Sequence, residues 1–405
     1  MLDDFGQRIR DIILSEMDLS RELSDEEICD LIGSVVSREA RDRPMTIKDR
    51  AELERTIFNS LRKLDVLQEL VDDRDVTEIM VNGPNDIFYE KAGRIQRFKG
   101  HFSSEEKLED VIQQIVGRHN RVVNQASPIV DTRLSDGSRV NIVLNPISIG
   151  GSAVSIRKFP EHPMSMERLV EIEALSPDVA RLLQILTQAK YNIFISGGTG
   201  SGKTTFLNAL SQYIPDDERI ITIEDSAELQ LLGAKNIVRL ETRNANTDGV
   251  TPITIRDLIR TALRMRPDRI IVGECRGAEA LDMLQAMNTG HDGSLSTGHA
   301  NSPHDIISRI ETMVLQGQDF PLNAIRQQIA SGIDIIVQLG RLRDKSRRVL
   351  EISEVDGFMD GEIVLHTLYR FEETAVLDSG MIQGFLKKAG TLCHTDKLMA
   401  AGLSV

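Results

Sequence analysis

The sequence predicts an α/β protein in which a helical segment and a small α+β domain precede a larger domain built on a parallel β-sheet. Three observations predict this order. A glycine-rich turn, GGTGSGKTT at 197–205, stands between an apolar strand-like run and a helix-like run. Short apolar runs separated by helical patterns follow it, which indicates a parallel sheet covered by helices on both faces. Before it, strand-like runs alternate with one helix and with glycine turns, as in many α+β domains.

The composition narrows the class of protein. The 405 residues suffice for two or three domains, and 40% hydrophobic with 27% charged residues is ordinary for a globular chain. No run approaches the roughly 20 apolar residues of a membrane helix, and the N-terminus lacks signal-peptide features, so we expect a cytoplasmic protein. A net charge of −14 argues against direct nucleic-acid binding. The distant Cys29, Cys275 and Cys393 suggest free thiols rather than disulfides.

The first part of the chain is predicted to be helical over residues 1–60, because apolar residues recur near one face of the segment 46–64. Residues 61–159 are expected to form the α+β domain. Its predicted elements are a strand at 76–83, two strands within 86–98 joined at Ala92-Gly93, a helix begun by the capping-box spacing of Ser103 and Glu106, and two strands around Gly150-Gly151.

A linker is predicted at 160–172, where two prolines interrupt any apolar period. The large domain then spans 173–405. Its strand-like runs are at 191–196, 219–225 and 269–274, and its clearest helix is at 254–266, stopped by Pro267. We expect the chain to end in a helical tail, since FLKKAGTLCHTDKLMAAGL is amphipathic. This tail would pack as a terminal helix or, less favourably, dock on a partner.

The turn at 197–205 fits the P-loop pattern, with a strand before it and a helix after it. Glycines let backbone N–H groups turn toward phosphate oxygens, and the helix N-terminus adds partial positive charge. Lys203 can reach the β- and γ-phosphates of ATP, and the Thr204 hydroxyl can ligate Mg²⁺. The predicted nucleotide-binding residues are Gly197, Gly198, Thr199, Gly200, Ser201, Gly202, Lys203, Thr204 and Thr205. The alternative is a chance glycine-rich turn.

Carboxylates follow two of the predicted strands. Glu224, Asp225 and Glu228 end the second strand, and Glu274 ends the third, with Arg276 just beyond it. The carboxyl ends of parallel strands lie beside the ligand site, so each of the first three could orient the attacking water. Glu274 is predicted to hold Mg²⁺ or its water. The alternatives are helix capping for the first group and an ion pair with Arg276 for Glu274.

Two histidines, His291 and His299, lie in the segment GHDGSLSTGHANS at 290–302, which is rich in Gly, Ser and Thr. Because this segment has no helical period, we expect a loop that approaches the γ-phosphate. A lone histidine is more often structural, and a zinc site is the alternative that we disfavour.

Taken together, GGTGSGKTT, TIEDSAEL and RPDRIIVGECRGAEALDMLQAMNTGHDGSLSTGHANSP resemble the type II/type IV secretion-ATPase superfamily. Its four motifs are named Walker A, Asp box, Walker B and His box. The runs VTEIMVNGPNDIFYEKAGRIQ, DTRLSDGSRVN and SIRKF most resemble the CpaF-like ATPases of Flp (tight-adherence) pilus assembly. The resemblance covers roughly residues 55–372.

This resemblance implies a RecA-like P-loop ATPase domain preceded by a PAS-like α+β domain. It implies a homo-hexamer at the cytoplasmic face of the inner membrane, docked on pilus or secretion platform proteins. ATP hydrolysis would there drive pilus assembly or secretion. It also assigns the catalytic glutamate to the Asp box, as Glu224 or Glu228, gives Glu274 the Walker B role, and makes His291 and His299 links between nucleotide state and subunit contacts.

The resemblance further implies that arginines of the α+β domain close on the γ-phosphate. The candidates are Arg133, Arg139 and Arg157, whose alternative is to be solvated charges at strand edges. An arginine supplied in this way is worth roughly 10³–10⁵ in rate. One departure from relatives is Gly298 before His299, which predicts a looser His-box backbone. Another is Cys275, which we expect to act as a small buried hydrophobe.

Four functions compete at this point. The first is an ATPase motor for Flp pilus assembly, and the second is a related motor for conjugative or effector type IV secretion or for DNA uptake. The third is a nucleotide-gated scaffold that assembles without hydrolysis, which the intact carboxylates disfavour. The fourth is a small-molecule P-loop kinase, which has no need of the α+β domain or of the histidine-containing segment.

Overall fold

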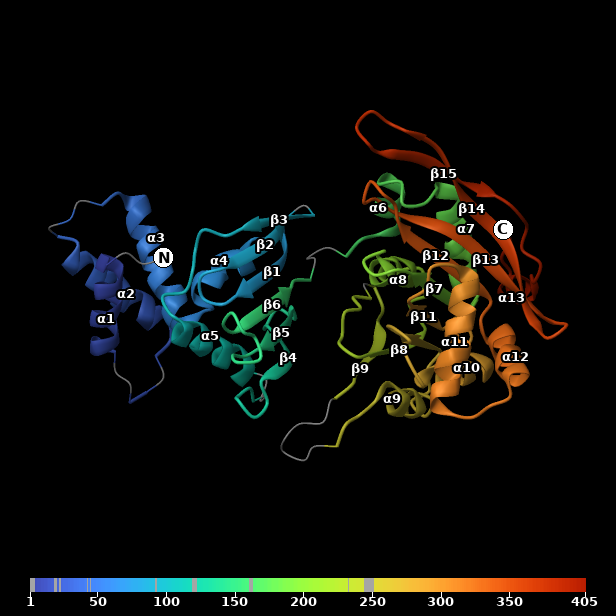
Figure 1. Cartoon of the computed structure of the whole chain (residues 1–405), viewed down its shortest axis with the longest axis horizontal. Helices are drawn as coiled ribbons and strands as arrows, with labels where there is room; N and C mark the ends of the chain where they lie inside the picture. Colours follow the sequence, from blue (N-terminus) through green and yellow to red (C-terminus); the bar gives the residue numbers. More distant parts are fainter. Residues whose placement is uncertain are drawn as a thin grey trace. The chain divides into compact units, whose positions relative to one another are not determined.

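The fold is described from a computed structural model of the chain (Figure 1). It describes residues 4–405 except 18–19, 22, 42, 44, 92, 119–121, 160–162, 232 and 244–250. The chain divides into two compact units, Met1–Glu161 (unit 1) and His162–Val405 (unit 2). In the described part of the chain, no helix is both long and apolar enough to cross a membrane.

Unit 1 begins with three helices, α1 (Asp4–Glu16), α2 (Asp25–Glu39) and α3 (Ile47–Arg62). Capping boxes start two of them, because Ser24 and Thr46 accept hydrogen bonds from backbone N–H groups in the first turns of α2 and α3. Their apolar faces meet in a separate small core that is built around Ile9, Ile28 and Ile57. The predicted helical segment is therefore a three-helix unit with its own interior.

The rest of unit 1 is an antiparallel sheet backed by a helix, in the order β3-β2-β1-β6-β5-β4. The elements are η1 (Asp65–Leu67), α4 (Gln68–Asp72), β1 (Val76–Asn82), β2 (Ile87–Lys91), β3 (Arg94–Arg97), α5 (Glu105–Gly117), β4 (Ile129–Arg133), β5 (Arg139–Val143) and β6 (Ala153–Arg157). The helix α5 is capped by Ser104, one residue later than the predicted Ser103, and Ser104 accepts from Lys107 N–H. The predicted joint at Ala92 lies outside the described residues.

Unit 2 contains a nine-stranded sheet in the order β15-β14-β13-β12-β7-β11-β10-β8-β9 (Figure 1). Its strands are β7 (Ile193–Gly197), β8 (Arg219–Glu224), β9 (Asn236–Glu241), β10 (Arg269–Val272), β11 (Leu295–Gly298), β12 (Ile335–Arg341), β13 (Arg347–Met359), β14 (Glu362–Val376) and β15 (Ile382–Lys388). Pairing is parallel from β12 to β9 and antiparallel from β12 to β15.

Helices cover both faces of this sheet. They are α6 (Met166–Glu171), α7 (Pro177–Gln188), α8 (Lys203–Ser211), α9 (Ile255–Ala262), α10 (Glu279–Asn288), α11 (Pro303–Gly317), α12 (Leu322–Gly332) and α13 (Asp396–Ala401). Along β7, Ile193 and Ile195 join the core shared with α6, α7, α8 and α13, whereas Phe194 joins the core shared with α9 to α12. This alternation is the period of a strand buried on both faces.

Three segments differ from the sequence predictions. Residues 295–298, expected within a loop, form β11, which is fully buried between β7 and β10. Gly298 there is packed tightly rather than loosely, since an added Cβ would lie 2.9 Å from the Phe194 ring and 3.0 Å from Ile306. Residues 166–171, expected as linker, form α6, which buries Met166 and Leu169 in the core of unit 2.

The predicted helical tail, residues 385–403, is helical only near its end. Residues 382–388 form β15, which pairs antiparallel with β14, and the only helix in the tail, whose residues are all described, is the six-residue α13. The prediction is wrong for 385–388, where β15 alternates exposed with less exposed residues as a strand does, and right for α13, whose Leu398 packs in the core of unit 2. Cys275, as expected, is buried, and its sulfur lies 3.9 Å from that of Met313.

Candidate functional site

The P-loop (197–205) joins the end of β7 to the start of α8 at the carboxyl edge of the sheet. Gly200 and Gly202 have φ values of +71° and +94°, the left-handed region that favours glycine. Gly197 has no room for a side chain, because an added Cβ would lie 2.7 Å from the Leu339 carbonyl oxygen on β12. The loop is thus a tight backbone cradle in front of a helix N-terminus, the arrangement that binds phosphate.

Lys203 lies inside this cradle and is only 7% exposed. Its Nζ donates to the carbonyl oxygens of Gly197 and Gly198, both at 3.1 Å, and lies 3.3 Å from Nδ1 of His299. Burial lowers the pKa of Lys203, while the negative charge of Glu274 acts in the opposite direction. The ammonium group is therefore held by neutral carbonyls and a histidine ring, which phosphate oxygens could replace.

Glu274 lies just beyond the end of β10, beside His299, which follows β11. Its Oε1 is 2.9 Å from His299 Nε2, and its Oε2 accepts from Arg276 Nη2 at 2.6 Å. Burial raises the pKa of Glu274, but the Arg276 hydrogen bond and the nearby positive charges outweigh it, so the pKa is lowered. Burial and the charge of Lys203 also lower the pKa of His299. Lys203, His299, Glu274 and Arg276 therefore form one connected cluster.

The Asp-box carboxylates differ in their surroundings. Glu224, at the end of β8, is 4% exposed, and its Oε2 accepts from the backbone N–H groups of Glu228 and Leu229 at 2.6 and 2.9 Å. Its side chain also packs on Gly273, where an added Cβ would lie 2.8 Å from the Glu224 Cγ. Glu224 thus shapes the loop that carries Glu228, and Asp225 faces Arg276 at 3.8 Å.

The P-loop also contains hydroxyl groups suited to a nucleotide and its metal. Ser201 Oγ is buried and has no hydrogen-bond partner among the described residues, as expected of a group that a ligand would satisfy. Thr204 is half-buried in the first turn of α8, and Thr205 next to it is exposed. A hydroxyl and one carboxylate, from Thr204 and Glu274, are the hard oxygen donors that Mg²⁺ takes when it also binds phosphate.

The two predicted histidines lie at opposite ends of the strand β11. His299 follows β11 at the carboxyl edge, in the cluster with Glu274. His291 precedes β11, at the amino edge, where its Nδ1 lies 3.2 Å from the Ala286 carbonyl oxygen and its own carbonyl accepts from Ser294 Oγ at 2.7 Å. The expectation that one loop brings both rings to the γ-phosphate therefore needs correction, because a strand lies between them.

The three predicted arginines of unit 1 form one row across its sheet. Arg133 on β4 is opposite Arg139 on β5, which is opposite Arg157 on β6, and Arg157 is opposite Glu78 on β1. Residues directly opposite one another in antiparallel strands project from the same face. Arg157 Nε lies 3.5 Å from Glu78 Oε1. The row places positive charge on one face of unit 1.

One residue at the site was missed from the sequence. Arg347, the first residue of β13, donates from Nε to the carbonyl oxygen of Gly200 in the P-loop at 2.8 Å. The two residues are 147 positions apart, and no local motif surrounds Arg347. Only the pairing of β12 with β7 and β13 brings Arg347 to the loop, so the sequence carried no signal for it.

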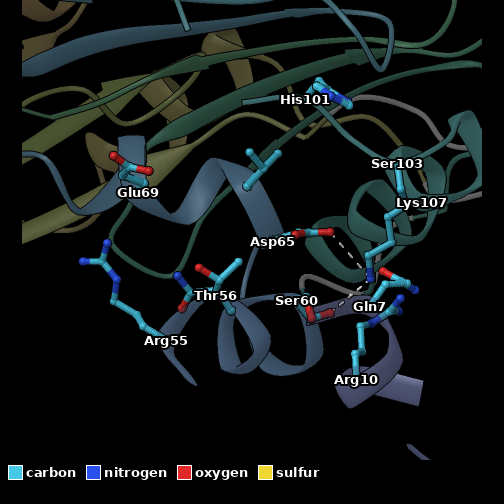
Figure 2. Close-up of a pocket in the computed structure, with 12 residues that line it drawn as sticks. Gln7, Arg10, Arg55, Thr56, Ser60, Asp65, Glu69, His101, Ser103 and Lys107 are labelled. Atoms are coloured by element: carbon cyan, nitrogen blue, oxygen red, sulfur yellow. Dashed lines mark hydrogen bonds and ion pairs between the residues drawn. The ribbon is translucent and has the colours of Figure 1, made fainter. Parts of the chain in front are cut away.

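Unit 1 contains a separate polar cavity of about 120 Å³ between α1, α3 and the start of α5 (Figure 2). Lys107 projects into it, donating to the Ser60 carbonyl oxygen at 3.1 Å and lying 3.9 Å from Asp65. Arg10 of α1 also lines the cavity. These contacts join the three-helix segment to the sheet domain, and none of the predicted site residues lines the cavity.

Comparisons with known proteins show which family the chain belongs to. The family described as type II/IV secretion system protein matches residues 60–379 of the chain. The chain is 33% identical over 322 residues to a putative conjugal transfer protein of Mycobacterium tuberculosis, covering 77% of this chain and 91% of that protein. It is 31% identical to the conjugal transfer protein TrbB of Rhizobium radiobacter, with 81% and 98% covered. The type IV secretion system protein PtlH of Bordetella pertussis is 33% identical, with 73% and 94% covered.

Solved structures confirm the predicted fold class. The pilus retraction motor PilT with bound ADP has a TM-score of 0.55 at 22% identity, covering 82% of this chain and 84% of that chain. The ATPase DotB of Legionella pneumophila has a TM-score of 0.53 at 22% identity, with 72% and 80% covered. The names of the three relatives above refer to conjugal transfer and type IV secretion, so they do not support the expected Flp pilus specialisation.

Proposed function

We propose that this chain, which belongs to the type II/IV secretion system protein family, binds and hydrolyses ATP in the P-loop of unit 2. The single observation that carries the proposal is the position of Lys203. Its ammonium group lies within the glycine cradle and 3.3 Å from His299, whose other ring nitrogen lies 2.9 Å from Glu274. A phosphate-binding cation, a histidine and an acid thus meet at the carboxyl edge of the sheet, where α/β proteins bind ligands.

Each residue of the cluster has a role in this proposal. Lys203 would exchange its carbonyl partners for β- and γ-phosphate oxygens, and the Thr204 hydroxyl with Glu274 would hold Mg²⁺. Bound Mg²⁺ would neutralise charge that develops on the phosphates. Glu224 or Glu228 would orient the attacking water. Because Glu224 is already engaged by two backbone N–H groups, Glu228 is the better placed of the two to move a proton.

The arginine row of unit 1 is proposed to complete the site. Phosphoryl transfer spreads negative charge over the γ-phosphoryl oxygens, and a guanidinium supplied there stabilises the transition state. Arg133, Arg139 and Arg157 would supply it when the two units close on ATP. Hydrolysis would then depend on whether the two units have closed on ATP. Such a dependence would let a ring of subunits couple hydrolysis to movement.

The machine that this activity serves is proposed to be a conjugative or effector type IV secretion apparatus. Support comes from the relatives at 31–33% identity that cover most of this chain. The second candidate is Flp pilus assembly, which the strand motifs of unit 1 favour. In either case we propose a homo-hexamer docked on membrane platform proteins at the cytoplasmic face, with no direct contact to nucleic acid.

The test measures ATP hydrolysis as a function of oligomer size, for the parent chain and for Lys203→Ala. We expect hydrolysis by the oligomer and a loss of roughly a hundredfold to a thousandfold in the variant, because one charge-assisted contact to the transition state is removed. Full activity in a monomer would contradict the ring proposal. Assembly without phosphate release by the parent would favour the non-hydrolysing scaffold instead.

A further inference from the structure

Carboxylates and a histidine lie on one side of the P-loop, and an arginine lies on the other. Glu224, Glu274 and His299 come from β8, β10 and β11, which lie to one side of β7 in the sheet. On the other side β7 pairs with β12, and Leu339 of β12 is opposite Gly197. The strand β13 begins next to the end of β12, with Arg347 opposite Arg341. Arg347 therefore reaches the loop from the side away from the carboxylates.

The side chain of Arg347 lies against the P-loop. Its Nε donates to the Gly200 carbonyl oxygen at 2.8 Å, and its Cδ is 3.5 Å from where a Cβ on Gly202 would stand. The residue is exposed, and its bond to Gly200 is the only side-chain hydrogen bond or ion pair that it makes with the described residues. Its two terminal guanidinium nitrogens thus remain available beside the phosphate cradle.

The turn that carries Arg347 is anchored on both sides. Asp344 accepts hydrogen bonds from the backbone N–H groups of Ser346 at 2.9 Å and Ile382 at 2.8 Å. The Ser346 hydroxyl, together with these backbone bonds, lowers the pKa of Asp344 to about 2. The neighbouring Arg348 is buried and donates to the Glu173 carbonyl oxygen at 2.8 Å. The backbone at Arg347 is therefore fixed before any ligand arrives, which reduces the entropy lost on binding.

We propose that Arg347 binds the phosphate oxygens that ADP and ATP share, as a nucleotide-binding residue outside the P-loop motif. The inference rests on the proposed function and names a further contact at the same site. A guanidinium is always charged, and its planar fork matches phosphate oxygens. Because Arg347 approaches from the side opposite Glu274, it contacts the part of the nucleotide that hydrolysis leaves unchanged. It therefore contributes to the ground state and the transition state equally, and affects KM rather than kcat.

The experiment measures the Kd for ADP by calorimetry with the full chain, and the steady-state KM and kcat for ATP. The variants are Arg347→Gln, which removes the charge, and Arg347→Lys, which keeps it. The matched control is Arg343→Gln, from the same turn, because Arg343 pairs with Glu373 instead of the P-loop. Thermal unfolding of each variant checks that the fold is intact.

We expect Arg347→Gln to raise the Kd for ADP and the KM for ATP roughly 10- to 100-fold, the size of a lost hydrogen bond to a charged group. Arg347→Lys should lose less, Arg343→Gln should match the parent, and kcat at saturating ATP should stay constant. Equal losses in Arg347→Gln and Arg347→Lys would overturn the proposal, since a role in holding the loop alone does not depend on charge. Parent-like affinity in Arg347→Gln, or a lower kcat at constant KM, would also overturn it.

The two proposals fail in different ways. If the parent binds ADP but does not hydrolyse ATP, the proposed hydrolysis is wrong, while the Kd for ADP in the variants still decides the role of Arg347. If the parent hydrolyses ATP and Arg347→Gln binds ADP as the parent does, only the inference on Arg347 is wrong. A parent chain that binds no ADP would overturn both.

Discussion

Both edges of the large sheet carry charged groups, but the partners of these groups differ between the two edges. At the amino edge Arg269 is 0% exposed, and its guanidinium donates to Glu218 at 3.1 Å and to the Thr187 carbonyl oxygen at 2.8 Å. At the carboxyl edge Lys203 is held by loop carbonyls, and Ser201 Oγ has no partner among the described residues. The buried charges of Arg269 and Glu218 at the first edge pair with each other, whereas the buried Ser201 hydroxyl at the second edge finds no partner in the described part of the chain.

This difference separates stability from function. In the buried ion pair of Arg269 and Glu218 all three guanidinium nitrogens donate, which links the start of β10 to the end of α7 and to the turn before β11. Loss of one partner leaves a buried charge. A cluster of half-buried groups held by weak partners can exchange them for phosphate. We therefore expect substitutions at the amino edge to change unfolding, and substitutions at the carboxyl edge to change hydrolysis.

The largest effect is expected at the amino edge. Arg269→Met should lower the free energy of unfolding of unit 2 by about 3–5 kcal/mol, because Glu218 stays buried without its guanidinium partner and keeps Lys190 Nζ at 3.7 Å. Denaturant unfolding measures this loss, with Arg168→Ala as the control, since Arg168 is exposed and forms an ion pair with the exposed Glu171. The control should change stability by less than about 1 kcal/mol. A fall in kcat of the folded Arg269→Met protein would contradict the expectation that residues at the amino edge affect stability and not hydrolysis.

The next effect is expected at the carboxyl edge. Glu274→Gln keeps the shape of the side chain but removes the charge, and should lower kcat roughly a hundredfold to a thousandfold with little change in melting temperature. Its counterpart is Glu218→Gln, which removes a charge from the amino edge. That variant should lower the melting temperature and leave kcat close to the parent value. The reverse pattern in these two variants would contradict the comparison.

A smaller effect is expected from the two histidines. His299→Gln should lower kcat roughly 10- to 100-fold, because His299 contacts both Lys203 and Glu274. His291→Gln at the opposite edge should leave kcat near the parent value. Steady-state phosphate release measures both, and equal losses in the two variants would show that the edge does not decide the effect.

The smallest effect is a dependence of stability on pH. The pKa of His299 is lowered in the folded chain by burial and by Lys203, so the unfolded chain binds the proton first as pH falls below about 6.5. The parent should therefore lose stability in that window relative to His299→Gln, and the two should run parallel above it. Unfolding free energies measured from pH 8 to pH 5 without nucleotide test this, and parallel curves throughout would contradict it.

The parts of this site that the sequence predicted are local in the chain. The P-loop is one contiguous motif, and Glu224 and Glu274 end apolar strands, so the rule for parallel sheets is enough to bring them together. For His299 the sequence predicts the right edge but the wrong kind of structure. The strand β11 is mostly Gly, Ser and Thr, so its sequence gives little apolar signal, yet it is fully buried between β7 and β10, with Gly298 against Phe194.

The parts that could not be predicted depend on pairing over long distances in the chain. The strands β13 to β15 form through contacts with one another and with β12, and the tail alone has an apolar pattern too short to separate a strand from a helix. Arg347 reaches the P-loop only through that pairing. The row of Arg133, Arg139 and Arg157 likewise required the strand register of unit 1.

A structure of the full chain with a non-hydrolysable ATP analogue and Mg²⁺ tests the proposed phosphate site most directly. We expect density for the phosphates within the loop at 197–205, with Lys203 turned from the Gly197 carbonyl to phosphate oxygens and Glu274 on the side of the terminal phosphate. A nucleotide bound elsewhere, with Lys203 still held by its own loop, would show that the P-loop is not the binding site.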